Sequence, residues 1–103
     1  MLDFHVDSES KVITLIFAGR MDTLAVTRVN EIIEAKPLME NWQSEYKIVF
    51  DLKEVDYISS SFIRVCVSYA QQAGPGRFSI DHCQPFVKKT FKISGLDELL
   101  NIS

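Results

Sequence analysis

The chain has 103 residues, which is enough for one domain and too few for two. Hydrophobic residues make up 47% of it, a fraction that supports a buried core and excludes a disordered chain. The formal net charge of −3 argues against nucleic acid or an anionic membrane as the main partner.

Targeting and metal-binding signals are missing from the sequence. The first residues, Met1 to His5, contain no basic segment followed by an apolar run, so we expect no signal peptide. Cys66 and Cys83 do not have the spacing of a metal site or redox pair, and a free Cys66 on a buried helix face fits a reducing cytoplasm. The two histidines are isolated, so we expect neither a metal nor a cofactor.

Strand and helix patterns alternate along the chain. Two β-branched or alternating runs joined by a polar turn open the chain as a hairpin, and helical periodicity then alternates with short apolar runs. The expected elements are strands 2–6 and 12–18, a helix from about 24 to 36, strand 46–52, helix 61–72, strand 77–82 and helix 84–93. Residues 96–100 read as a last helical turn, and residues 101–103 as a short edge strand.

This order predicts an α/β fold. Helices between strands imply right-handed crossovers and a partly parallel sheet, and the opening hairpin makes that sheet mixed. The order is β-β-α-β-α-β-α in a single domain over residues 1–103.

The last helix carries both apolar and basic side chains. Its apolar or semi-apolar positions are Phe86, Val87, Thr90 and Phe91, and Pro85 is tolerated in its first turn. Lys88 and Lys89 indicate a solvated face.

Three consecutive serines, Ser59, Ser60 and Ser61, mark the start of the helix at 61–72. A hydroxyl at a helix N-terminus can cap the helix, and a phosphate there meets free N–H groups and the positive end of the helix dipole. The residues alone therefore leave two interpretations: plain capping, or a phosphorylation switch. They also leave open which hydroxyl would accept the phosphate.

Other residues near this helix start have two interpretations each. Asp22 or Thr23 can cap the helix that follows strand 12–18. Phe62 either joins the apolar face of its helix or, if exposed, anchors a partner. Arg64, four residues after Ser60, can pair with a phosphate or an acidic partner group, or simply be solvated.

An enzymatic function has little support. Ser60 is not in a G-x-S-x-G elbow, and His82 is the only histidine in the later half of the chain. Neither G-x-G-x-x-G nor G-x-x-x-x-G-K occurs, so the sequence predicts no catalytic residue and no nucleotide site of its own.

Three segments carry a resemblance to a known family. The central one, residues 51–65, is similar to Asp-Leu-x-x-Val-x-(Phe/Tyr)-(Ile/Met)-(Asp/Ser)-Ser-(Ser/Ala/Thr)-Gly-Leu. Residues 16–22 are similar to a strand-Gly-x-(Leu/Met)-Asp segment, and residues 93–100 to a Thr-Gly-Leu-Asp-x-Leu close. With these segments in this order, the chain resembles the STAS domain of bacterial anti-sigma factor antagonists. Phe62 departs from the pattern, which usually has Gly there.

The resemblance implies a fold and a function. It implies a STAS fold, with a mixed four- to five-stranded sheet and helices packed mainly on one face. It implies a cytoplasmic bacterial regulator of transcription that binds an anti-sigma factor, itself a serine kinase, while unphosphorylated. Phosphorylation by that partner, which would bind the ATP, ends binding, and a phosphatase resets it. Register aligns the phosphorylated serine with Ser60.

The resemblance also implies a partner surface and leaves an alternative. The surface comprises Asp22, Thr23, Ser59, Ser60, Ser61, Phe62 and Arg64. No direct contact with nucleic acid or membrane is expected, and the domain would be a monomer or weak dimer. The alternative is a constitutive, unphosphorylated subunit of a complex such as a lipid-transport ATPase, which an apolar Phe62 in a permanent interface would favour.

Overall fold

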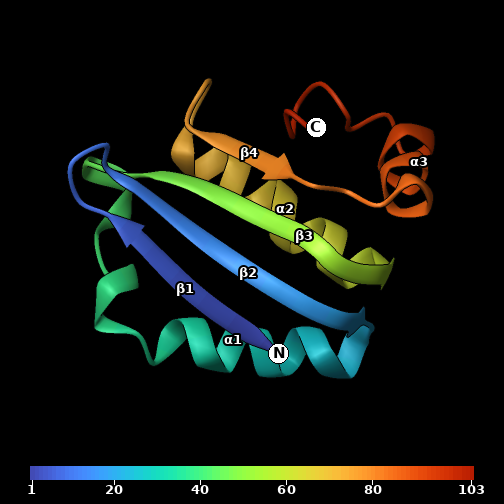
Figure 1. Ribbon diagram of the computed structural model, residues 1–103, viewed down its shortest axis with the longest axis horizontal. Helices are drawn as coiled ribbons and strands as arrows, with labels where there is room; N and C mark the ends of the chain where they lie inside the picture. Colours follow the sequence, from blue (N-terminus) through green and yellow to red (C-terminus); the bar gives the residue numbers. More distant parts are fainter.

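The structure is a computed structural model that describes residues 1–103. It consists of a mixed β-sheet and three α-helices (Figure 1). The strands are β1 (Leu2–Asp7), β2 (Val12–Met21), β3 (Lys47–Ile58) and β4 (Phe78–Asp81). The helices are α1 (Thr23–Glu34), α2 (Ser60–Ala73) and α3 (Pro85–Ile93), and the single turns Pro37–Met39 and Trp42–Ser44 join α1 to β3. The predicted order β-β-α-β-α-β-α is confirmed.

The sheet is mixed, as predicted. Its strand order is β1-β2-β3-β4, with β1 antiparallel to β2 and the other neighbours parallel. The predicted fifth strand is reduced to one bridge, in which Ile102 pairs with Ile80 beside β4. The backbone N–H of Ser103 donates to the Ile80 carbonyl at 2.9 Å, so this tail lies along the outer edge of β4.

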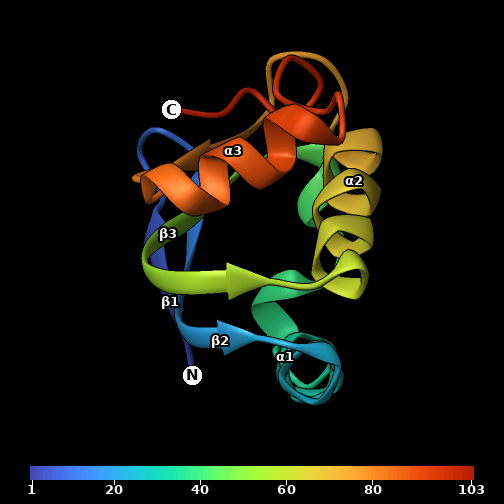
Figure 2. The same ribbon diagram turned by 90° about the vertical axis from the view of Figure 1, so that its right-hand side faces the viewer.

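The core lies between one face of the sheet and the helices. Alternate side chains of β2 and β3 are fully buried on this face, among them Phe17 and Phe50, whose ring centroids are 4.8 Å apart. Helices α1 and α2 cover the same face, and α3 packs against the later half of β3 (Figure 2). None of the helices combines the length and apolar character that crossing a bilayer requires.

Strand β3 is longer than predicted, and the prediction stopped short because two register shifts with β2 break the alternation of its side chains. It continues to Ile58 instead of ending at Leu52, and its register with β2 shifts within this extension. Leu52 and Val55 are both buried with two exposed residues between them, so strict alternation ends at Leu52. The backbone N–H of Lys53 donates to the Asp51 carboxylate at 3.0 Å, which holds the irregular turn of the strand.

Several other boundaries differ from the prediction by one to three residues. Strand β2 runs three residues beyond Ala18 to Met21, and α2 begins at Ser60 instead of Ser61. The last helical turn predicted at residues 96–100 is present, since the N–H of Leu100 donates to the Leu96 carbonyl at 2.9 Å; Gly95, with a positive φ of 74°, separates it from α3.

Candidate functional site

The predicted site lies where two neighbouring parallel strands end and two helices begin. Met21 at the end of β2 pairs with Ile58 at the end of β3, and the N–H of Ser59 donates to the Met21 carbonyl at 3.0 Å. Helix α1 follows one strand after Asp22, and α2 follows the other after Ser59. Sheet register therefore brings the two helix N-termini to the same end of the molecule (Figure 2).

Asp22 is the N-cap of α1. Of the two capping residues that the sequence predicts, Asp22 and Thr23, Asp22 is the one that caps the helix. Its carboxylate accepts a hydrogen bond from the N–H of Ala25 at 2.9 Å, and its side chain is still 47% exposed. Thr23 is the first residue of the helix and lies exposed beside it.

Arg20 lies beside Asp22 and contacts Tyr57, and the sequence analysis assigned neither Arg20 nor Tyr57 to the site. The Arg20 guanidinium stacks 3.9 Å from the centroid of the Tyr57 ring, and its Nε lies 3.9 Å from an Asp22 carboxylate oxygen. The position of Arg20 two residues before the cap is visible in the sequence. Its contact with Tyr57 depends on the strand register Arg20–Tyr57, which follows a bulge and cannot be counted from sequence.

The three serine hydroxyls differ in their hydrogen bonds. Ser59 is the N-cap of α2, and its Oγ accepts from the N–H of Phe62 at 3.3 Å. The same Oγ lies 2.8 Å from Oγ of Ser61, so these two half-buried hydroxyls bond to each other. Ser60, the first residue of the helix, is exposed, and its side chain forms no hydrogen bond. One hydroxyl of the three is thus free and accessible.

Phe62 belongs to the core and not to the surface. It exposes none of its area, and its ring lies edge-on to Phe17 with centroids 5.2 Å apart. The interpretation of Phe62 as a core residue is confirmed, and the expectation that it contacts a partner is wrong. A phenyl ring at this position points inward because the third residue of α2 faces the sheet.

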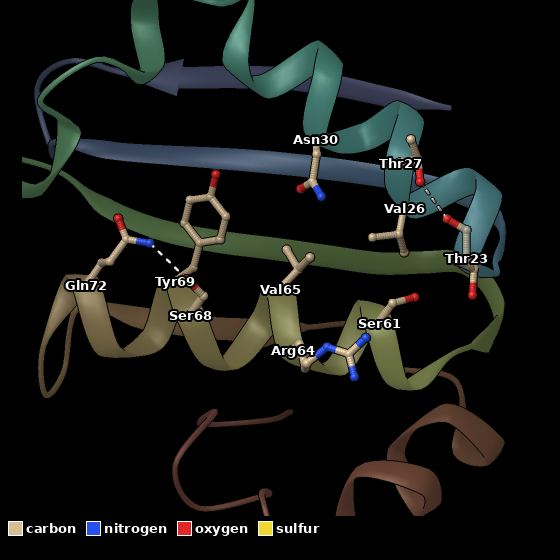
Figure 3. Close-up of a pocket in the computed structure, with 10 residues that line it drawn as sticks. All are labelled: Thr23, Val26, Thr27, Asn30, Ser61, Arg64, Val65, Ser68, Tyr69 and Gln72. Carbon is tan, nitrogen blue, oxygen red and sulfur yellow. Dashed lines mark hydrogen bonds between the residues drawn. The ribbon is translucent and has the colours of Figure 1, made fainter.

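A polar groove of about 480 Å³ runs between α1 and α2 (Figure 3). Thr23 and Ser61 line it near the helix starts, and Arg64 points along α2 toward Ser61. Arg64 is exposed and forms no ion pair. Further along the groove, burial and then the nearby carboxylate of Glu34 raise the pKa of the Tyr69 hydroxyl, so this group is neutral at pH 7.

No histidine or acidic side chain is hydrogen-bonded to Ser59, Ser60 or Ser61. The structure contains no group of three or more His, Cys, Asp or Glu side chains able to hold a metal ion. His82 Nδ1 lies 3.3 Å from an Asp51 carboxylate oxygen and is not hydrogen-bonded to a serine.

Comparison with known proteins places this chain in a family. The model of the STAS domain matches residues 6–103. The chain belongs to the STAS-domain family. No curated protein is significantly similar to this STAS domain in sequence.

Several solved structures share the fold. An anti-sigma factor antagonist from Mycobacterium paratuberculosis superimposes with a TM-score of 0.76 at 17% identity, covering 99% of this chain and 85% of that one. Unphosphorylated SpoIIAA, an anti-sigma factor antagonist, gives a TM-score of 0.75 at 16% identity, covering 100% and 88%. The phosphorylated form of SpoIIAA, described as a Bacillus cell fate determinant, gives 0.70 at 16% identity, covering 100% and 91%. The predicted STAS fold is confirmed.

Proposed function

We propose that this STAS domain is an anti-sigma factor antagonist that binds an anti-sigma factor while unphosphorylated and is switched off by phosphorylation of Ser60. Structures with the same fold include anti-sigma factor antagonists, one of them solved both with and without phosphate. The partner surface comprises Asp22, Thr23, Ser59, Ser60, Ser61 and Arg64.

The hydrogen-bond pattern of the three serines is the observation that carries this proposal. A kinase needs a hydroxyl that can enter its active site without breaking the fold. The Ser59 and Ser61 hydroxyls bond to each other and to the helix start, whereas the Ser60 hydroxyl is exposed and unbonded. Ser60 is therefore the acceptor we expect.

The phosphorylation step needs no catalytic group from this domain. Oγ of Ser60 forms a bond to the γ-phosphorus of an ATP held by the kinase, the bond to the leaving ADP breaks, and the hydroxyl proton passes to a base of the kinase. A phosphatase then hydrolyses the phosphoserine and restores the hydroxyl.

The phosphate acts on the partner more than on this domain. It adds roughly 1.5 to 2 negative charges at the first turn of α2, where the helix dipole favours negative charge. The Asp22 carboxylate, with Arg20 Nε 3.9 Å away, caps the adjacent helix start. A partner surface complementary to the neutral serines would then bury two neighbouring negative groups, and the desolvation and repulsion of these groups oppose binding.

The alternative of a constitutive subunit loses its supporting observation. An exposed, bulky apolar Phe62 would favour a permanent interface. Phe62 is instead fully buried in the core, so it is not available for such a contact. The proposed function instead fits a bacterial cytoplasmic regulator, in which the buried thiol of Cys66 stays reduced.

Mass spectrometry of the protein purified from its own host tests the proposal. We expect one added phosphate on the peptide that contains residues 59–61. It should disappear in Ser60→Ala and persist in the matched control Ser61→Ala. Absence of phosphate under every growth condition, together with a stable co-purifying partner, would overturn the switch and favour the constitutive subunit.

A further inference from the structure

Helix α3 presents an exposed face that the proposed switch does not use. The helix buries only Val87 and Phe91. Two large apolar side chains point outward instead: Phe86 is 65% exposed and Ile93 is 76% exposed. At about 100° per residue they lie on one side of the helix, with Lys89 between them.

The exposed side of the helix is also strongly basic: Lys89 lies next to Phe86 and Ile93, Lys92 lies farther round, and Lys88 lies on the flank about 160° from Phe86. Lys88, Lys89 and Lys92 are all exposed, and none of them forms an ion pair. Residues 82–96 contain no Asp or Glu, although the whole chain has a net charge of −3. Glu54 and Asp56 on β3, and Asp97 and Glu98 after the helix, form no ion pair with these lysines. Positive charge is thus concentrated on one short helix.

We propose that this basic α3 face (Phe86, Lys88, Lys89, Lys92 and Ile93) docks an acidic, amphipathic segment of a protein partner. Exposed aromatic and aliphatic side chains fit apolar pockets or helix faces, and the flanking lysines select carboxylates and accelerate encounter. Helix α3 lies at the same end of the molecule as the turn between β3 and α2 (Figures 1 and 2). Docking at α3 does not require phosphorylation of Ser60.

A lipid surface fits this face less well than a protein does. Only two apolar side chains project from a helix of nine residues, and even a single myristoyl chain gives marginal membrane binding. The net charge of −3 also repels an anionic surface outside the reach of the three lysines.

The helix is held firmly enough to present this face. Val87 and Phe91 are fully buried against the sheet, and the side-chain amide of Gln84 donates to the Lys53 carbonyl at 2.9 Å. A partner therefore meets an ordered surface and does not have to fold it on binding.

Nuclear magnetic resonance with the full ¹⁵N-labelled chain tests the proposal. The probe is a synthetic peptide of about 18 residues, long enough to form a helix, with Leu along one face and Glu elsewhere. We expect amide shifts concentrated in residues 85–94, with binding that weakens as salt screens the charges. Lys88→Glu/Lys89→Glu should weaken binding at least about tenfold, since it reverses the charge that attracts the peptide. Phe86→Ala should also weaken it.

The controls separate this face from general charge effects. Lys36→Glu/Lys47→Glu changes the net charge by the same amount away from α3 and should bind the peptide like the unchanged protein. Equal binding of a peptide with Lys in place of Glu, shifts outside α3, or no binding at all would overturn the proposal. Sedimentation with phosphatidylcholine–phosphatidylglycerol vesicles, lost in Lys88→Glu/Lys89→Glu while the peptide does not bind, would overturn it in favour of a membrane.

Discussion

The first turns of α1 and α2 lie side by side, and each is capped by a side chain, but the two capping groups differ. Asp22 caps α1 with a carboxylate, and Ser59 caps α2 with a hydroxyl that also bonds to Ser61. The third residue of α1 is the half-buried Ala25, whereas the third residue of α2 is the fully buried Phe62. One helix start has a carboxylate cap with Arg20 beside it and a small third residue; the other has a hydroxyl cap and is anchored by an aromatic ring. Negative charge can therefore be added at α2 without displacing its anchor.

The largest expected effect comes from removing that anchor. Phe62→Ala should lower the free energy of unfolding by about 3–5 kcal/mol, because it leaves a cavity beside Phe17 and Phe50. The matched control is Leu24→Ala in α1, where the side chain is 63% exposed, and we expect a change within about 0.5 kcal/mol. Urea unfolding of both variants measures the difference; similar losses in the two would contradict the contrast between the helix starts.

Removing either helix cap should cost less stability than removing Phe62. Asp22→Ala and Ser59→Ala should each cost about 1 kcal/mol, since each leaves a helix N–H without its acceptor. Asp22→Asn keeps the acceptor and removes the charge, so it should cost only about 0.3–1 kcal/mol at low salt. If Asp22→Asn were as damaging as Asp22→Ala in thermal melts, the charge and not the hydrogen bond would dominate the cap.

Most of this arrangement was predictable from the sequence, and the exceptions have physical causes. Alternating strand and helix periodicities predicted the element order, and Asp22 and the serines were expected at helix starts. The length of β3 was missed because a bulge breaks the alternation after Leu52. The contact of Arg20 with Tyr57 and the different environments of the three serines depend on register and side-chain geometry, which a one-dimensional pattern does not contain.

Changes at Ser60 should hardly affect stability, which distinguishes it from its neighbours. Ser60→Ala removes an exposed, unbonded hydroxyl, and we expect a change within about 0.5 kcal/mol. Ser60→Asp adds negative charge at the first position of α2 and should stabilise the domain by about 0.3–1 kcal/mol at low salt. Chemical unfolding at low and high salt checks both; a large loss in Ser60→Ala would reveal a structural role and weaken its assignment as the acceptor.

Ser60 can accept a negative charge, whereas burial disfavours a negative charge on the thiol of Cys83, near α3. Burial raises the pKa of Cys83 to about 11, even though Lys88 acts to lower it. The folded state therefore holds this proton more tightly than the unfolded state, and the associated stability is lost as the pH rises from about 9 toward about 11. Melting temperatures of the unchanged protein and Cys83→Ala across this range measure the effect: the unchanged protein should lose more.

Alkylation provides an independent measurement of the pKa of Cys83. Reaction of Cys83 with iodoacetamide should be slow at pH 8 and accelerate up to about pH 11, since the thiolate is the reactive form. Cys66, fully buried and with its pKa raised further by that burial, should remain unmodified in the folded protein. Rapid modification of Cys83 at pH 7 would contradict the raised pKa.

The pairing of Ile102 with Ile80 has a consequence for self-association. An outer strand with free N–H and C=O groups is a template for strands of other chains, and such addition leads to aggregates. Backbone bonds from Asn101 and Ser103 occupy these groups at Ile80 and Cys83. Residues 101–103 thus shield this edge of the sheet from the addition of strands from other chains.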